Sequence, residues 1–348
     1  GAMNVAQRSA SVTGIGAADG YFTLDRWEID IASASAGRLT MTQTADGPVG
    51  FANCIKLDCT TADTSIAAGE NLLLQQRFEG QDLQSIGKGV AGAKEITVSF
   101  YVKANAAFTF GVELYDVDNG RQITKLFNTT TGWVRHEITF PADVDDGSSP
   151  FDDDNALSLI VNFWLHGGAT YTGGTLNTAA WADNTNANRA AGIDSFYSST
   201  DNNFFITGVQ LEVGSVATPF EHRSFGEELA LCQRYFYKTE NTDTDGYKRY
   251  SVMHVENATN SRSKYALPVP MRDNPALTKT GTIAIYNSAG GIINTTSITL
   301  APVLTQAVGL GYRDICIFAV VAGGNTSGTV GTLLSNNSAA SLSFDAEL

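Results

Sequence analysis

The segment LSLIVNFWLH, from Leu157 to His166, places a tryptophan two residues after an asparagine and two before a histidine. Residues two apart project from the same face of a β-strand, so Asn162, Trp164 and His166 would share one face. Aromatic rings stack on the apolar C–H faces of a pyranose, and neighbouring polar groups hydrogen-bond its hydroxyls. The pattern is therefore suited to carbohydrate binding.

Two more predicted strands, at 95–103 and 108–115, and the long loop at 167–192 would extend this face. The candidate glycan-contacting residues are Tyr101, Glu113, Tyr115, Asn162, Trp164, His166 and Tyr171. A loop or subunit that covers the face would instead make Trp164 an ordinary packed residue, and that interpretation is slightly the stronger. Trp181, in the same loop, is interpreted as an anchor that fixes the loop to the sandwich.

The loop PADVDDGSSPFDDDN, at 141–155, carries six aspartates. Carboxylates are ligands for Ca²⁺, but this spacing matches no EF-hand loop because the glutamate at position 12 is missing. The preferred interpretation is a solvated acidic loop, with no cofactor and a structural Ca²⁺ left open. The candidate calcium ligands are Asp152, Asp153 and Asp154, and Asp143, Asp145 and Asp146 complete the acidic set.

Enzymatic chemistry is not expected. A glycosidase needs two carboxylates that flank the scissile bond, and Glu113 with Glu212 can be nominated, but both read as ordinary strand residues. No GxSxG turn occurs, and no glycine-rich stretch has the lysine and following helix of a phosphate-binding loop. The four cysteines have no metal-ligand spacing and are expected to be free. None of the four histidines is adjacent to a serine or cysteine nucleophile in a recognisable turn. They are His136, His166, His222 and His254.

Alternation of apolar and polar residues in several segments predicts half-buried antiparallel strands, hence a β-sandwich or jelly roll. Four segments carry this signal, at 95–103, 108–115, 157–165 and 204–213. In the last of these, the expected inward residues are Phe205, Thr207, Val209, Leu211 and Val213.

One helix interrupts the strand pattern. Ser224 and Glu227 form a capping-box sequence, and helix-favouring residues follow, so a helix is expected over 225–236. Because strands are predicted through most of the chain and only this one helix is expected, the predicted fold class is all-β. It comprises an N-terminal jelly-roll β-sandwich at 4–222, a short connecting helix at 223–238 and a smaller C-terminal β domain at 239–348.

The charge balance excludes two classes of partner. The chain has 36 acidic and 22 basic residues, a net charge of −14, which repels nucleic-acid phosphates and anionic lipid. No apolar run reaches the ~20 residues of a membrane-spanning helix. Gly1, Ala2 and Met3 are interpreted as a protease-cleavage scar.

The segment ITGVQLEVGSVATPFEHRSFGEELALCQRYFYK, at 206–238, resembles one that recurs in bacteriophage tail-fibre and tail structural proteins. There it closes a carbohydrate-binding-module-like jelly roll and leads into a small terminal β domain. Further pieces resemble the same family: NVAQRSASVTG with GYFTLDRWEI, ITVSFYVKA, GTLNTAAWADNTNANRAAG, LPVPMRDNPALT and FDAEL.

The resemblance implies a non-enzymatic component of the virion tail that is made in the bacterial host cytoplasm. The protein would form a homotrimer, and it would also contact other tail proteins. It would attach to host cell-surface polysaccharide or lipopolysaccharide through the sandwich. The alternatives are a purely structural tail or virion decoration protein without a ligand and, less favoured, a polysaccharide depolymerase.

Overall fold

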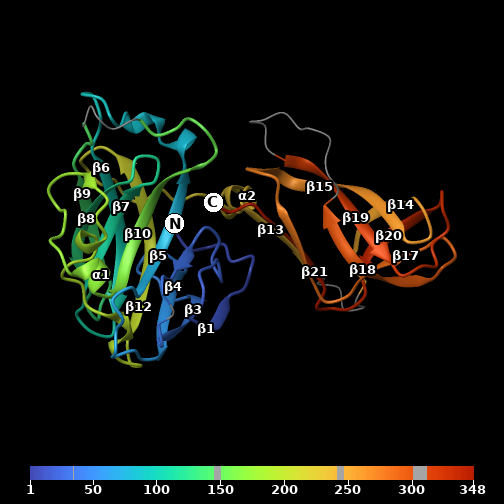
Figure 1. Ribbon diagram of the computed structural model, residues 1–348, viewed down its shortest axis with the longest axis horizontal. Helices are drawn as coiled ribbons and strands as arrows, with labels where there is room; N and C mark the ends of the chain where they lie inside the picture. The colour runs from blue at the N-terminus through green and yellow to red at the C-terminus, as the bar shows by residue number, and fades with distance from the viewer. Residues whose placement is uncertain (34, 145–149, 241–246, 301–311) are drawn as a thin grey trace. The chain divides into compact units, whose positions relative to one another are not determined.

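The computed structural model describes all residues except 34, 145–149, 241–246 and 301–311. The chain divides into two compact units, one of Gly1–Glu228 together with Leu348 and one of Leu229–Glu347. Both consist mainly of β-strands (Figure 1). The predicted all-β fold class is therefore confirmed. Among the described residues, no helix is long and apolar enough to cross a membrane.

The N-terminal unit contains two antiparallel sheets of six strands each. Sheet A has the order β1 (Ser11–Ile15), β3 (Arg38–Thr44), β4 (Cys54–Thr61), β12 (Asn203–Val213), β6 (Ile96–Ala104) and β9 (Val134–Phe140). Sheet B has the order β11 (Ala182–Asp183), β8 (Arg121–Asn128), β7 (Thr109–Asp116), β10 (Leu157–Gly167), β5 (Asn71–Glu79) and β2 (Glu28–Asp30). Short helical turns, including α1 (Ala169–Thr172) and η4 (Phe196–Ser198), lie in the connecting loops.

The core of this unit lies between the two sheets, where the predicted inward residues of β6, β7 and β10 meet. Phe100 of β6 packs edge-on against Phe163 of β10, with ring centroids 5.0 Å apart. Each fully buried side chain of this size contributes about 1.5–3 kcal/mol through removal of apolar surface from water. The period-2 interpretation of these three strands is confirmed.

The predicted phase of β12 is wrong in its first half. Phe204 and Ile206 are in the core, whereas Phe205 lies on the outer face beside Lys56 and Lys103. The strand register shifts between Thr207 and Gln210, and Gly208 there has a φ of +62°. This β-bulge reverses the side-chain alternation, so the inward positions after it are Val209 and Leu211.

The cysteines are free thiols, as the sequence predicts. Cys54 and Cys59 are both buried, and burial raises the pKa of each to about 11. Their thiols therefore stay protonated and unreactive at neutral pH.

Helix α2 (Phe225–Gln233) begins with the predicted capping box. The Ser224 amide donates to Glu227 Oε2 (2.9 Å), and the Glu227 amide donates to Ser224 Oγ (3.3 Å). The helix ends three residues earlier than expected, because Phe236 already pairs with Asp345 in a sheet.

The C-terminal unit has a three-stranded sheet and a closed six-stranded barrel. The sheet has the order β13 (Phe236–Glu240), β21 (Ser341–Asp345) and β16 (Ala276–Thr280). The barrel has the order β14 (Arg249–Val255), β15 (Asn260–Met271), β19 (Tyr312–Val321), β18 (Ile292–Leu300), β17 (Ile283–Tyr286) and β20 (Val330–Ser335). Phe344 stacks on Tyr265 with ring centroids 5.3 Å apart, and Leu342 is buried with it.

Candidate functional site

The face predicted to stack on sugars lies on the outer side of sheet B, and its central residues are buried. Trp164, Glu113 and His166 are 0% exposed and Asn162 is 2% exposed. The Glu113 carboxylate accepts hydrogen bonds from Asn162 Nδ2 (2.8 Å) and Trp164 Nε1 (2.9 Å). The chain itself covers these residues, so of the two interpretations left open by the sequence, the covered face is the one that the structure has.

The cover comes from the segment at 168–195. Arg189 donates two hydrogen bonds to Glu113, from Nε and Nη2, each 2.8 Å long. Its guanidinium also lies over Trp164 and Tyr115, 5.0 and 4.8 Å from the ring centroids. Tyr171 packs on Trp164 with ring centroids 5.2 Å apart. Trp164 is therefore a packed residue under this cover. Tyr115 and Tyr171 are half-buried at the margin of the face.

Trp181 anchors the same loop, as predicted. It is 7% exposed, and its Nε1 donates to the carbonyl oxygen of Pro141 (2.9 Å).

His166 is also buried on this face and contacts Ser195 and Glu70. Its Nδ1 lies 2.8 Å from Ser195 Oγ, and its Nε2 lies 3.5 Å from Glu70 Oε2. Burial lowers the pKa of His166, and the carboxylates of Glu70 and Asp63 offset this only in part. Burial likewise lowers the pKa of His136.

We expect stability to fall as the pH drops below about 6.5, the ordinary histidine pKa. The unfolded chain binds protons first, because the folded-state pKa values of His136 and His166 lie lower. The free energy of unfolding continues to fall until the pH is below the folded-state pKa values of both histidines. The slope is up to about 1.4 kcal/mol per pH unit for each histidine. Urea unfolding at pH 7.5, 6.5 and 5.5 measures the slope, which His166→Asn should reduce and the exposed His222→Gln should retain. A flat profile over this range would contradict the assignment.

Tyr101 belongs to a different surface from the other candidates. It lies on β6 in sheet A, whereas Glu113 and Trp164 lie on sheet B. Its ring contacts Phe51, with centroids 5.3 Å apart, and Arg135 lies over it at 5.9 Å. The sequence pattern identified the outward positions of β6, β7 and β10 but could not assign these strands to sheets.

The acidic loop contains one aspartate that is already paired. Arg121 Nε and Nη2 donate to the two carboxylate oxygens of Asp143, at 2.8 and 3.0 Å. Asp152, Asp153 and Asp154 are exposed, while Asp145 and Asp146 lie outside the described residues. No group of three or more potential metal ligands occurs among the residues that the structure describes.

We expect added calcium to leave the melting temperature unchanged, because the three exposed aspartates retain their hydration. Differential scanning calorimetry with and without millimolar CaCl₂ measures this. A rise that the triple variant Asp152→Asn, Asp153→Asn, Asp154→Asn abolishes would instead establish a calcium site there.

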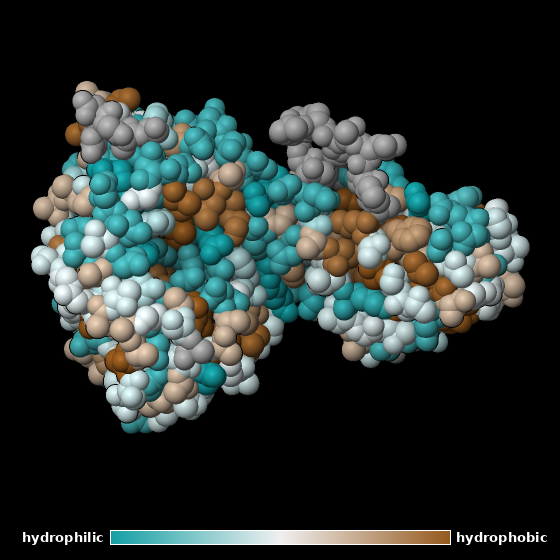
Figure 2. Space-filling model, in the orientation of Figure 1, coloured by the Kyte–Doolittle hydropathy of each residue, from teal (hydrophilic) through white to brown (hydrophobic). Residues whose placement is uncertain are grey.

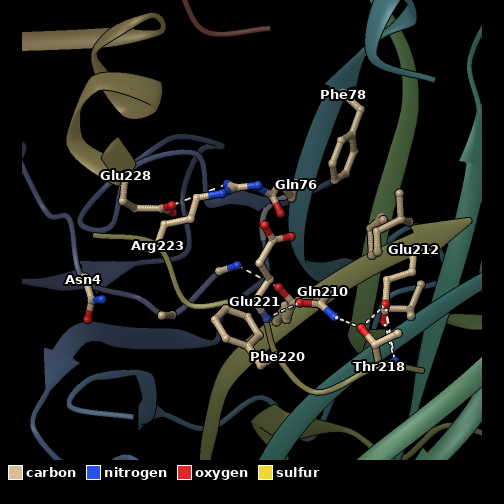
Figure 3. Close-up of a pocket in the computed structure, with 16 residues that line it drawn as sticks. Asn4, Gln76, Phe78, Gln210, Glu212, Thr218, Phe220, Glu221, Arg223 and Glu228 are labelled. Carbon is tan, nitrogen blue, oxygen red and sulfur yellow. Dashed lines mark hydrogen bonds and ion pairs between the residues drawn. The ribbon is translucent and has the colours of Figure 1, made fainter. Parts of the chain in front are cut away.

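A cavity of about 250 Å³ opens in the N-terminal unit, lined by strands of both sheets (Figure 3). Gln76 and Phe78 of β5 form one wall, and Gln210 and Glu212 of β12 form another. The segment at 218–223 folds over the strands, and Gly1, Ala2 and Asn4 complete the lining. Phe220 and Phe78 supply aromatic surface beside these polar groups.

The chain after β12 is fixed by side chains of that strand. The Glu221 amide donates to Gln210 Oε1 (2.7 Å), and the Thr218 amide donates to Glu212 Oε2 (3.2 Å). Burial opposes ionisation of Glu212, but hydrogen bonds from Gln210 and Thr218 outweigh it and lower its pKa. Glu212 is therefore a structural anion. It lies on β12 of sheet A, whereas Glu113 lies on the covered outer face of sheet B and is bonded to Arg189.

Two polar groups in the cavity keep their hydrogen-bonding capacity. Within the described part of the chain, the side chains of Gln76 and Glu221 make no hydrogen bond. Arg223 pairs with Glu228 across 3.6 Å. The cavity thus presents an amide, carboxylates and two aromatic rings to a ligand, which suits hydroxyl groups and apolar ring faces together.

Sequence reasoning missed this cavity, although one signal was present. Gln76 occupies the core phase of β5, two residues after Leu74 and two before Phe78, and it is opposite Val161. A polar residue in a core phase requires either a partner or solvent. Here the cavity provides the solvent.

The structure defines an all-β protein with an N-terminal jelly-roll sandwich. No protein-family model matches the chain, and no curated protein does. It is similar to a solved CBM4 structure at a TM-score of 0.30 and 12% identity, over 61% of this chain and 99% of that chain. It is also similar to the family 11 carbohydrate-binding module of a Clostridium thermocellum cellulase, at a TM-score of 0.29 and 13% identity. That match covers 60% of this chain and 99% of the module. A third similar structure is tailspike protein 4 of bacteriophage CBA120, at a TM-score of 0.29 and 11% identity. That match covers 54% of this chain and 19% of the tailspike chain.

Proposed function

We propose that the chain is a non-catalytic, glycan-binding component of a bacteriophage tail fibre, located in the virion tail. Its partners would be host cell-surface polysaccharide or lipopolysaccharide and other tail proteins. The resemblance of the segment at 206–238 to tail-fibre proteins supports the tail assignment. Several copies in a homotrimer would strengthen individually weak contacts through multivalency.

The cavity lined by β5, β12 and the segment at 218–223 is the observation that carries glycan binding. The free Gln76 amide and Glu221 carboxylate can each bond sugar hydroxyls, and Phe78 and Phe220 offer apolar faces. Three glutamates and one arginine line the cavity, so a neutral sugar fits better than an acidic one. Figure 2 shows hydrophilic and intermediate residues mixed over the visible face of the N-terminal unit, with one hydrophobic cluster near its upper centre.

Binding of the protein to glycan arrays and intact host cells tests the proposal. We expect Gln76→Ala and Glu221→Gln each to weaken binding about tenfold or more, the equivalent of one lost hydrogen bond of ~1.4 kcal/mol. Glu95→Gln makes the same chemical change at an exposed position outside the cavity and should bind as the wild type does.

Two outcomes would overturn the proposal. Absence of binding to every glycan and host cell would favour the structural alternative, a tail or decoration protein without a ligand. Release of reducing ends from polysaccharide would establish a depolymerase.

A further inference from the structure

A buried cluster of two cations and two carboxylates lies in the N-terminal unit and shares no residue with the cavity. Lys88 Nζ lies 2.6 Å from Asp116 Oδ2 and 3.5 Å from Asp143 Oδ2. The side chains of Lys88 and Asp116 are 1% and 0% exposed, and that of Asp143 is 4% exposed. A lysine ammonium is thus held between two carboxylates without access to bulk water.

Separate elements hold the three reacting groups in place. Asp116 ends β7, and the Asn119 amide and side chain donate to its carboxylate at 3.0–3.4 Å. The Gly89 amide donates to the carbonyl oxygen of Asp143 (2.9 Å), which joins the Lys88 loop to the acidic loop. Arg121 fixes the Asp143 carboxylate, and Phe151 lies over Lys88 Nζ at 5.5 Å.

We propose that Lys88 and Asp116 become joined by an intramolecular isopeptide bond, with Asp143 as the proton carrier. The inference concerns a covalent modification of the fold and does not depend on the proposed function.

The reaction balances with the groups present. Asp143 removes a proton from the Lys88 ammonium, and the free amine attacks the carboxyl carbon of Asp116. The new C–N bond forms as the C–O bond to one Asp116 oxygen breaks. That oxygen leaves as water with the two protons that Lys88 loses, and Asp143 regains its initial state. An ammonium and a carboxylate become one neutral amide, without an oxidant or a co-reactant.

Burial and positioning supply the driving force. Well-oriented groups in an intramolecular reaction reach effective concentrations of about 10⁵–10⁸ M, which offsets the unfavourable condensation in water. An ion pair in a low-dielectric interior carries a desolvation penalty for each charge. The amide replaces both charges with one neutral group, so the buried environment favours the product.

Intact-mass spectrometry of the full chain tests the proposal directly. The folded wild type should weigh one water molecule less than its sequence, and digestion should release a branched peptide that joins Lys88 to Asp116. Lys88→Arg keeps the positive charge but cannot form the bond, so this variant should have its full sequence mass.

Further variants distinguish the reaction from other losses of water. Asp116→Asn should still react but lose ammonia instead, whereas Asp116→Ala should keep its full mass. Asp143→Asn should remain unlinked for longer than the wild type, because its proton carrier is gone. A wild-type mass equal to that of the sequence, in fresh and in aged protein, would overturn the proposal and leave an ordinary buried ion pair.

Discussion

Replacing Glu113 by alanine should lower the free energy of unfolding by about 3–5 kcal/mol, the usual result of removing one partner of a buried ion pair. The substitution leaves the Arg189 guanidinium without its carboxylate. It also leaves Asn162 Nδ2 and Trp164 Nε1 without their acceptor, in a region that water does not reach. Urea unfolding followed by tryptophan fluorescence measures the change.

The matched control is Glu137→Ala, which removes a glutamate that pairs with Arg135 on the exposed face of sheet A. Exposed pairs contribute about 0–1 kcal/mol, so this variant should remain close to the wild type. The double variant Glu113→Ala, Arg189→Ala should be less destabilised than the sum of its single variants, since the uncompensated charge is removed. A Glu113→Ala variant as stable as Glu137→Ala would show that the covering segment is not held by this network.

Gly208→Ala should lower the free energy of unfolding by about 2–4 kcal/mol. A left-handed backbone conformation costs a residue with a Cβ about 1–2 kcal/mol, and Gly208 has a φ of +62°. The added Cβ would also lie 2.7 Å from Phe51 Cζ and 3.0 Å from Tyr101 Cδ2. Such overpacking costs about 1–3 kcal/mol, because the rings must shift. Thermal and urea unfolding both measure the loss.

Gly120→Ala separates the two contributions. Gly120 has a φ of +61°, close to that of Gly208, but a Cβ there would meet no atom within 4 Å. This variant should therefore show only the conformational part, and the difference between the two variants gives the packing part. Equal losses at both positions would contradict the packing argument.

The sequence determined the local structure of this protein well. Period-2 alternation in β6, β7 and β10 predicted which residues are in the core, because a strand presents alternate side chains to opposite faces whatever its partners are. The capping box of Ser224 and Glu227 likewise predicted the start of α2, since both hydrogen bonds lie within four residues. These signals require no knowledge of distant segments.

Only the tertiary structure decided which outward faces remain open. Trp164 and Glu113 occupy an outward phase, but Arg189 and Tyr171, from a later segment, cover them. The order of strands placed Tyr101 on sheet A, away from the other candidates. Strand order and loop cover arise from contacts between residues far apart in the chain, and a local pattern contains no information about them. The sequence by itself therefore determined the inward and outward positions of β6, β7 and β10. The bulge at Gly208 decided those of β12, and long-range packing decided which outward positions reach solvent.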